Sequence, residues 1–298
     1  MPAPRPPTLP ILTAALGVAL HLAGCAPAIE ATSSTGGADF VTGVQHLASD
    51  NGLSANGLSA NGLSANGLFS TWFNQTLATA PAVMQYLYAC AAPLGSTLTW
   101  TNPATGVAYR WIGWLGLAPD WAAGASATVA EQQLVSACLA AHVNKFGVHI
   151  PIAVEGRTAK GVQITIGAGE LTTFSNREAC FFGNLFTGQG IFAGLDHSVW
   201  ANPQSSARAC AFDNTSSGAP AVDCLPLVYV GLCNKICKAD ASKTFYESCT
   251  YNGVTYKPLV TRIRSAEIYT CGDGVCQFTE KCGTRAEWWQ CKDCGPCP

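Results

Sequence analysis

Cysteine is the residue type with the most chemical potential in this chain. The last 28 residues contain CGDGVC (residues 271–276), Cys282 and CKDCGPCP (residues 291–298). Six of the fifteen cysteines of the chain lie there. Three of these six have C-x-x-C-x-x-C spacing, which occurs in zinc sites, in redox centres and in disulfide frameworks. The choice among the three depends on the compartment in which the chain folds.

The N-terminus predicts export. Arg5 precedes a mostly apolar run from Leu9 to Ala23, which is too short to span a bilayer and is typical of a signal peptide covering residues 1–24. The run ends in LAGC at Cys25, which resembles the lipobox of bacterial lipoproteins. That resemblance implies that Cys25 becomes the acylated N-terminus; the alternative is an ordinary secretory signal in which Cys25 is incidental. No later run of 18 or more apolar residues exists, so lipid would be the membrane anchor.

Export favours disulfides over the other two chemistries. Setting Cys25 aside leaves fourteen cysteines, with eight before the tail and six within it. Both blocks are even, as full pairing requires. An oxidising compartment disfavours zinc ligation, and a redox C-x-x-C usually lies in a βαβ pattern, which the tail lacks. We predict that Cys90 pairs with Cys138, because these are the first two cysteines of the core. The predicted disulfide cysteines are Cys90, Cys138, Cys180, Cys210, Cys224, Cys233, Cys237, Cys249, Cys271, Cys276, Cys282, Cys291, Cys294 and Cys297.

The composition is typical of a folded chain and disfavours functions that depend on a strongly charged surface. Charged residues make up 11%, apolar residues 48%, and the formal net charge is −2. Basic residues are scattered, so nucleic acid is not an expected partner. The sequence also predicts no cofactor.

A repetitive segment separates the signal from the rest of the chain. Residues 25–70 are small and polar and contain NGLSANGLSANGLSANGL (residues 51–68). A pentapeptide-repeat β-helix is disfavoured, because a glycine precedes each leucine and four units are too few to bury a solenoid face. The Asn-Gly pairs favour a flexible, lipid-anchored spacer rich in turns.

Two resemblances extend this layout. The NGL tandem, with VMQYLYACA, GLAPDW, VSACLAAHVNKFGVHIPI and FFGNLF, resembles exported myxobacterial lipoproteins of uncharacterised function. The tail CGDGVC…C…CKDCGPC is similar to a short cysteine-rich repeat appended to many secreted bacterial proteins. Neither resemblance implies an activity or supplies catalytic residues.

Residues 71–270 are expected to form a disulfide-stapled α+β core, mostly antiparallel, with two early helices. The first helix follows Pro81, and the second begins at the capping box Thr128–Glu131 and should stop near Gly147. Alternating residues predict a hairpin over 96–111, strands over 148–154 and 162–166, and a hairpin at Asn252-Gly253. Residues 271–298 are expected to form a separate cysteine-rich module.

The residue types that could catalyse a reaction form no motif. His142 falls on an apolar helix stripe and is expected to be a packed core residue. The triplet Asp196-His197-Ser198 has catalytic residue types, but adjacency in sequence is not triad geometry, so a polar loop is favoured. The chain has no G-x-S-x-G elbow, H-E-x-x-H pair, Walker loop or Rossmann fingerprint.

Aromatic and acidic residues offer binding alternatives. Six aromatic residues could form a sugar-binding platform, although core packing is favoured for them. They are Trp100, Tyr109, Trp111, Trp114, Trp121 and Trp200. In the tail, Trp288 and Trp289 have little interior to occupy, so at least one is expected to be exposed as a contact surface. Three tail acids, Asp273, Glu280 and Asp293, could hold calcium, but turn formation is the simpler interpretation.

The sequence therefore predicts an exported protein, lipid-anchored to the bacterial envelope at the outer membrane or cell surface. We expect a non-catalytic domain for binding or envelope structure, with the membrane and a glycan or protein as partners. The alternative is an extracytoplasmic hydrolase, acting on carbohydrate or peptide, whose site forms no recognisable motif.

Overall fold

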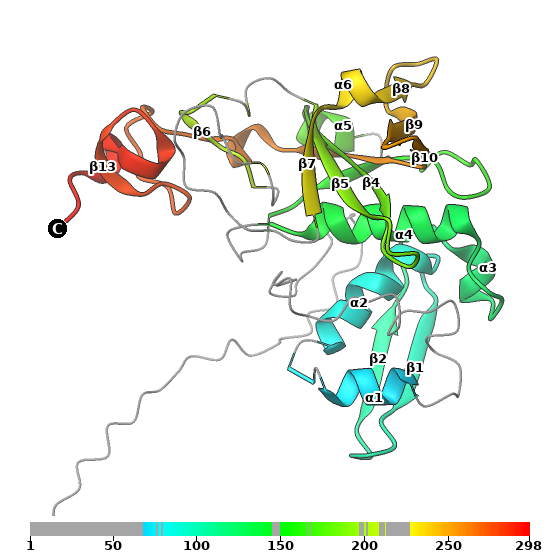
Figure 1. Ribbon diagram of the computed structural model, residues 1–298. Helices are drawn as coiled ribbons and strands as arrows, with labels where there is room; N and C mark the ends of the chain where they lie inside the picture. The colour runs from blue at the N-terminus through cyan, green and yellow to red at the C-terminus, as the bar shows by residue number, and fades with distance from the viewer. Residues whose placement is uncertain are drawn as a thin grey trace, which may run out of the picture. The chain divides into compact units, whose positions relative to one another are not determined.

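The computed structural model describes residues 68–75, 77–78, 80–144, 150–164, 166–167, 169–196, 200, 202–208, 212 and 227–298 (Figure 1). The chain divides into two compact units, Met1–Gly37 and Ala38–Pro298, and all described residues belong to the second. The predicted signal peptide, Cys25 and the NGLSA repeats up to Gly67 lie outside the described residues. No described helix is both long and apolar enough to cross a membrane.

The core of the second unit is built on a five-stranded sheet of order β3-β11-β4-β5-β7. Neighbouring strands are antiparallel except β5 and β7, which run parallel. The strands are β3 (Ala153–Gly156), β4 (Asn176–Asn184), β5 (Gly190–Leu195), β7 (Leu227–Leu232) and β11 (Leu259–Ile263). The central strand β4 is apolar and buried on both faces from Ala179 through Phe182, so both faces of the sheet must be covered.

Helix α4 (Val129–His142) covers one face of this sheet, packing mainly on β4 (Figure 1). The helix begins with the predicted capping box: the Thr128 hydroxyl accepts from the Glu131 backbone N–H, and the Glu131 carboxylate accepts from the Thr128 N–H. The expectation that it runs close to Gly147 is wrong. Val143 is already extended, at φ −76° and ψ 127°, so the helix ends at His142.

A smaller layer covers the opposite face. It consists of the three-stranded sheet β10-β9-β8 and the short helix α6 (Cys233–Ile236). Its strands are β8 (Cys237–Ala239), β9 (Tyr246–Tyr251) and β10 (Val254–Tyr256). Phe182 and Phe192 of the large sheet pack there against Phe245 and Tyr256. The β9–β10 hairpin turns at Asn252 and Gly253, whose φ angles of 49° and 76° are those that the Asn-Gly pair predicts.

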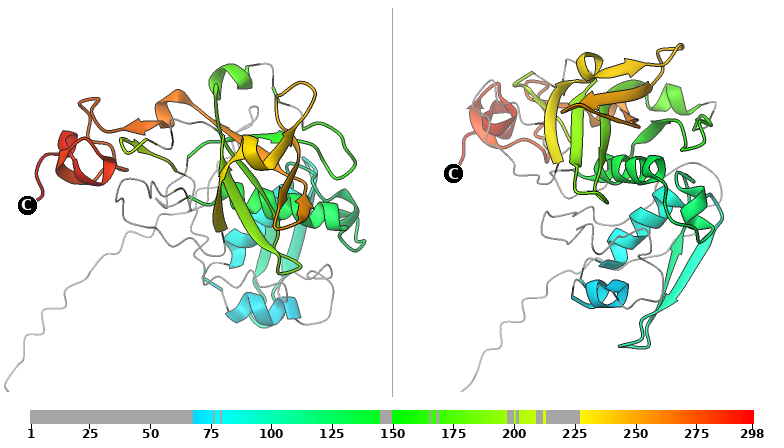
Figure 2. Two further views of the ribbon diagram at one scale, coloured as in Figure 1. Left: turned by 45° about the horizontal axis from the view of Figure 1, so that its top comes forward. Right: turned by 45° about the vertical axis from the view of Figure 1, so that its right-hand side comes forward.

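The N-terminal part of the described chain forms a helix and hairpin layer against α4 (Figure 2). It contains α1 (Leu68–Gln75), α2 (Ala80–Ala91), β1 (Thr97–Thr101), β2 (Ala108–Ile112) and α3 (Pro119–Ala122). The predicted 96–111 hairpin is confirmed, with Trp100 opposite Tyr109 and Leu98 opposite Trp111. Helix α1 was not predicted, and it begins at Leu68, inside the segment assigned to the spacer.

One strand prediction is only partly correct and another is wrong. Strand β3 begins at Ala153, so Ile150 and Ile152 are buried without belonging to a strand. Among the described residues of 162–166, Gln163 alone makes a sheet-like contact, an isolated bridge to Arg157. Their apolar alternation instead buries Ile164 against the core while Val162 stays exposed.

The remaining elements connect the core to the tail. Strand β6 (Ser205–Ser206) pairs with β12 (Tyr269–Thr270), which follows a short 3-10 helix, Ser265–Glu267. Helix α5 (Glu170–Thr173) precedes β4, and the tail contains β13 (Cys282–Arg285) and two 3-10 turns, Trp288–Gln290 and Lys292–Cys294. The chain is α+β and mostly antiparallel, as its sequence predicts.

Candidate functional site

Three disulfides lie in the core. Cys90 on α2 bonds to Cys138 on α4, which joins the N-terminal layer to the helix that covers the sheet and is the predicted pair. Cys180 on β4 bonds to Cys233 on α6, and Cys237 bonds to Cys249 across β8 and β9. These last two disulfides are adjacent, with the Cys180 and Cys237 sulfurs 3.7 Å apart. Cys180–Cys233 fastens the smaller layer to the large sheet, and Cys237–Cys249 lies within the smaller layer.

A glycine makes room for one of these bonds. A Cβ atom added to Gly194 on β5 would lie 2.9 Å from the Cys180 sulfur and 3.1 Å from the Cys233 sulfur. A larger residue would therefore displace the disulfide that joins the two layers. Cys210 and Cys224, also predicted to pair, lie outside the described residues.

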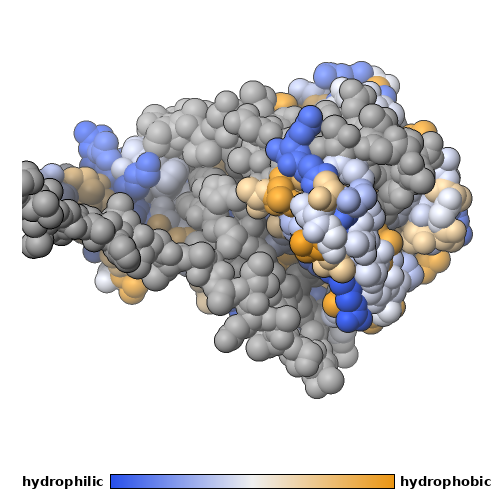
Figure 3. Space-filling model, turned by 90° about the horizontal axis from the view of Figure 1, so that it is seen from below, coloured by the Kyte–Doolittle hydropathy of each residue, from blue (hydrophilic) through white to orange (hydrophobic). Residues whose placement is uncertain are grey.

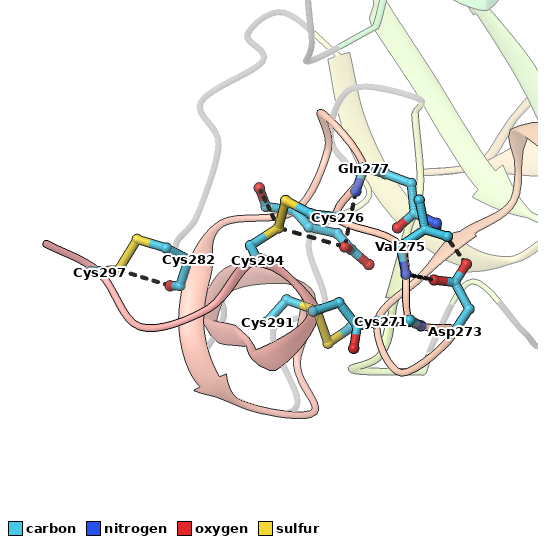
Figure 4. The surroundings of a disulfide bond; sticks show 12 residues. Cys271, Asp273, Val275, Cys276, Gln277, Cys282, Cys291, Cys294 and Cys297 are labelled. Carbon is cyan, nitrogen blue, oxygen red and sulfur yellow. Dashed lines mark hydrogen bonds between the residues drawn. A yellow bond between two sulfur atoms is a disulfide. The ribbon is translucent and has the colours of Figure 1, made fainter.

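Three further disulfides lie within the tail (Figure 4). The bonded pairs are Cys271–Cys291, Cys276–Cys294 and Cys282–Cys297. None of the six described disulfides joins the tail to the core. The tail sulfurs are bonded to one another, so they are not available as zinc thiolates. A chain with this many disulfides belongs to an oxidising, extracytoplasmic compartment.

The tail also makes backbone contacts with a core segment. The Cys271 N–H donates to the Gln204 carbonyl at 2.9 Å, and the Trp288 N–H donates to the Pro203 carbonyl at 3.2 Å. Trp288 is 4% exposed and packs edge-to-face on Trp289, with ring centroids 5.7 Å apart. Trp288 therefore forms the interior of the tail, and only Trp289, which is half-buried, has surface to offer a partner.

A buried ion pair lies on the face of the sheet that α4 covers. The Arg208 guanidinium donates to Glu178 Oε2 through Nη2 at 2.8 Å and Nε at 3.2 Å. Arg208 also donates to the Ala141 carbonyl at 2.9 Å, and the Thr261 hydroxyl donates to the same Glu178 oxygen at 2.8 Å. Arg208 and Glu178 side chains are 1% and 0% exposed, so substrate cannot reach them.

A second charged cluster lies on the opposite face, under the smaller layer. Arg262 donates through Nε to Glu155 Oε2 at 2.8 Å, and Arg177 forms an ion pair with Asp196. The Tyr246 hydroxyl donates to Asp196 Oδ1 at 2.8 Å. Burial raises the pKa of Glu155, an effect that the Arg262 guanidinium opposes, and burial together with the Asp196 carboxylate raises the pKa of Tyr246.

This second cluster contains the residue types of a general acid and base, but its members are committed to one another. Glu155 is 1% exposed and bonded to Arg262, whose Nη1 also donates to the Ser175 carbonyl. Asp196 is the acid of the Asp196-His197-Ser198 triplet, and its two oxygens contact Arg177 and Tyr246. His197 and Ser198 lie outside the described residues.

The remaining buried core carboxylates also have structural contacts. Glu131 accepts the Asp120 N–H at 2.7 Å as well as its capping-box bond. Asp240 accepts backbone N–H groups from Ser242, Thr244 and Phe245. Within the part of the core that the structure describes, each buried carboxylate therefore has arginine or backbone donors as partners.

The histidine and the aromatic residues mostly pack in the interior. His142 is 1% exposed, and its Nδ1 lies 2.8 Å from the Cys138 carbonyl, so it is the core histidine that the sequence predicts. Trp100, Tyr109 and Trp111 surround Phe73 in edge-to-face contacts. Trp121 packs on Tyr88, and Trp200 is buried. Trp100, Tyr109 and Trp111 also stack on one another, but Trp111 is buried and the other two rings are partly buried against the core.

The three tail acids lie around the Gly-Asp-Gly turn. Asp273 accepts the Val275 N–H at 2.8 Å (Figure 4). Asp293 Oδ2 accepts the N–H groups of Gly272 and Gly274. Glu280 accepts the Gln277 N–H at 3.2 Å. The turn role favoured from sequence is therefore present for all three.

Comparison with protein-family models, curated proteins and solved structures finds no match to this chain.

The sequence did not reveal the ion pairs between buried arginines and acids. In Arg177-Glu178 the two neighbours lie on opposite faces of β4, which places each charge in a different layer. The strand pattern of β4 could have indicated this, but the partners Asp196, Arg208 and Arg262 are distant in sequence, and only the sheet order brings them together.

Proposed function

We propose that this chain is a lipid-anchored envelope protein that presents a disulfide-stabilised domain for binding or for envelope structure, without catalysing a reaction. Three features support the proposal. LAGC at the end of an apolar run resembles a lipobox, six disulfides match an oxidising compartment, and the likeness of the tail to repeats on secreted bacterial proteins agrees with both.

The arrangement of the buried carboxylates carries the non-catalytic part of the proposal. A general acid or base must reach the substrate and exchange a proton with it. Glu155, Glu178 and Asp196 instead pair with arginines, and Glu131 and Asp240 accept backbone N–H groups. Among the described residues the acids of the core therefore stabilise the fold.

The distribution of exposed apolar residues supports a protein that binds its partners through small contact areas. On the face shown in Figure 3, the coloured hydrophobic residues occur as separate spots among polar ones. Exposed apolar side chains are distributed over many elements, among them Leu94, Ile112, Val162 and Tyr229. Scattered apolar residues of this kind do not mark a large docking surface.

Anchoring is tested with Cys25→Ser in the producing cell. We expect the wild-type protein to partition into the detergent phase and the variant into the aqueous phase, because the acyl chains supply the membrane affinity. Cys210→Ser, which removes a cysteine outside the lipobox, is the matched control and should still partition with detergent. Equal detergent partitioning of Cys25→Ser and the wild type would contradict lipidation.

Binding and catalysis are separated in one screen of the mature, oxidised protein. Cosedimentation with purified peptidoglycan and a glycan array tests binding, and a panel of glycosidase, esterase and peptidase substrates tests turnover. We expect retention on one envelope polymer without turnover, and loss of retention when the disulfides are reduced. Turnover that disappears in Asp196→Asn and His197→Ala would instead establish the hydrolase.

A further inference from the structure

The tail contains a cluster of carboxylate oxygens that no salt bridge among the described residues neutralises. Asp273 lies between Gly272 and Gly274, whose φ angles of 108° and 85° close a tight turn. Asp293 reaches this turn from the other end of the tail and accepts its N–H groups. The Gln277 amide nitrogen donates to Asp273 Oδ2 at 2.6 Å, and Figure 4 shows the Gln277 side chain turned toward Asp273.

Glu280 is the buried member of this cluster. It is 8% exposed, and one of its oxygens, Oε2, accepts the Gln277 N–H. Its other oxygen, Oε1, is buried and has no hydrogen-bond donor among the described residues, and the same is true of Gln277 Oε1. A buried acceptor without a donor costs about 1–3 kcal/mol, and more when it is charged. Two such oxygens from neighbouring side chains call for a shared positive partner.

The surrounding groups increase this requirement. Oxygens of Glu280 and Asp293 lie within 4.8 Å of each other and of the Cys271 and Cys291 sulfurs. No described salt bridge reaches any of the three acids, although the tail carries Lys281, Arg285 and Lys292.

We propose that Glu280 and Asp293, together with the Gln277 amide oxygen, bind one calcium ion beside the Gly-Asp-Gly turn. Calcium takes six to eight oxygen ligands in flexible geometry, so a turn that supplies carboxylate, amide and backbone oxygens suits it. Zinc and other thiophilic metals are disfavoured, because the nearby sulfurs are bonded in disulfides and are not thiolates. Magnesium demands a stricter octahedron and gives up its water reluctantly.

The disulfides hold the ligands in place. Glu280 lies between Cys276 and Cys282, and Asp293 lies between Cys291 and Cys294. The bond Cys276–Cys294 brings these two stretches together, and Cys271–Cys291 holds the Gly-Asp-Gly turn beside Asp293. The ligand set therefore depends on the oxidised state, which an exported protein maintains.

The test is calorimetric titration of the full mature, oxidised, chelator-treated protein with CaCl2, and separately with MgCl2. We expect one calcium per chain and weaker or no magnesium binding. Glu280→Gln and Asp293→Asn should each weaken calcium binding by roughly tenfold or more, because each removes a charged ligand. Glu247→Gln, which removes an exposed carboxylate that pairs with Lys238 on the core, should bind as the wild type does.

Disulfide mapping of every variant keeps the result interpretable. Each variant must retain Cys271–Cys291 and Cys276–Cys294, so that weakened binding reflects a lost ligand and not a lost fold. Absence of calcium uptake by the wild type at millimolar CaCl2 would overturn the proposal, as would equal affinities of Glu280→Gln and Glu247→Gln. Neither result bears on the anchoring or on the polymer binding of the domain.

Discussion

At the scale of single residues, the core is organised by arginines that neutralise buried acids on both faces of one sheet. Arg208 makes three hydrogen bonds in the described structure, two to Glu178 and one to the Ala141 carbonyl. Thr261 supplies a further donor to the same Glu178 oxygen. A pair so fully bonded offsets much of the cost of removing two charges from water, but either charge alone would be strongly unfavourable.

We predict that Arg208→Met lowers the free energy of unfolding by about 3–5 kcal/mol, because it leaves the Glu178 carboxylate buried without its cation. Urea or thermal unfolding of the oxidised protein measures the change. Lys160→Met is the control, since the Lys160–Asp120 pair is 60% and 44% exposed and should contribute little to stability.

The double variant Arg208→Met, Glu178→Leu separates the two contributions. Replacing both charges with apolar side chains should recover most of the lost stability, since no uncompensated charge remains. A loss below about 1 kcal/mol in Arg208→Met alone would mean that water or another group solvates Glu178, and would contradict the buried pair.

At the scale of elements, capping and turn signals predicted the structure better than the periodicity of apolar residues did. The capping box at Thr128 and the Asn252-Gly253 turn are confirmed, because each depends on contacts within a few residues. Apolar alternation over 162–166 predicted a strand, yet burying Ile164 requires no strand partner beyond the bridge at Gln163. The parallel pairing of β5 with β7 could not be read from sequence, since it depends on the path of the chain between them.

The β8–β9 connection shows how one carboxylate fixes an element. Asp240, at the end of β8, accepts N–H groups from Ser242, Thr244 and Phe245, and also the Ser242 hydroxyl. Burial of Asp240 acts to raise its pKa, but the hydrogen bonds from Ser242, Phe245 and Thr244 outweigh burial and hold the pKa at about 2. The folded state therefore favours the charged form more than the unfolded chain does.

The lowered pKa of Asp240 predicts that the folded state loses stability in acid. Because the folded pKa is depressed below the ordinary value of 3.8, the contribution of Asp240 is fully present above that value and is lost as pH falls toward about 2. We expect Asp240→Asn to be less stable than the wild type at pH 6, and the difference to shrink between pH 4 and pH 2. Thermal melts across this range measure it.

Glu247→Gln is the matched control for the Asp240 prediction. Glu247 lies on β9 and pairs with Lys238 at the surface, with side chains 42% and 77% exposed, so its removal should alter the melting curves little. A constant difference between Asp240→Asn and the wild type from pH 6 to pH 2 would show that Asp240 is not the group that titrates.

At the scale of the whole molecule, disulfides divide along the same boundary as the sequence. Among the described residues, Cys90–Cys138 joins the N-terminal layer to α4, Cys180–Cys233 joins the large sheet to the smaller layer, and Cys237–Cys249 lies within the smaller layer. Three more bonds lie in the tail. The tail has little interior of its own beyond Trp288, so the ordering of its 28 residues depends on cross-links that restrict the unfolded chain, each contributing about 2–4 kcal/mol. The even count in each block indicated this division, whereas only the structure shows that the tail also hydrogen-bonds to Pro203 and Gln204.

Complete pairing is the prediction that belongs to this scale. Twelve of the fourteen cysteines that follow Cys25 are bonded in the described residues, which leaves Cys210 and Cys224 to pair with each other. Thiol titration of the denatured, unreduced mature protein should detect no free thiol, and peptide mapping should recover a Cys210–Cys224 bond. A stop codon at Cys271 is the companion variant, and its core should still fold with all of its own disulfides, since no described bond crosses the boundary. Two free thiols in the wild type would contradict complete pairing, and any bond between the cysteines of residues 271–297 and those of residues 90–249 would show that the tail is part of the core domain.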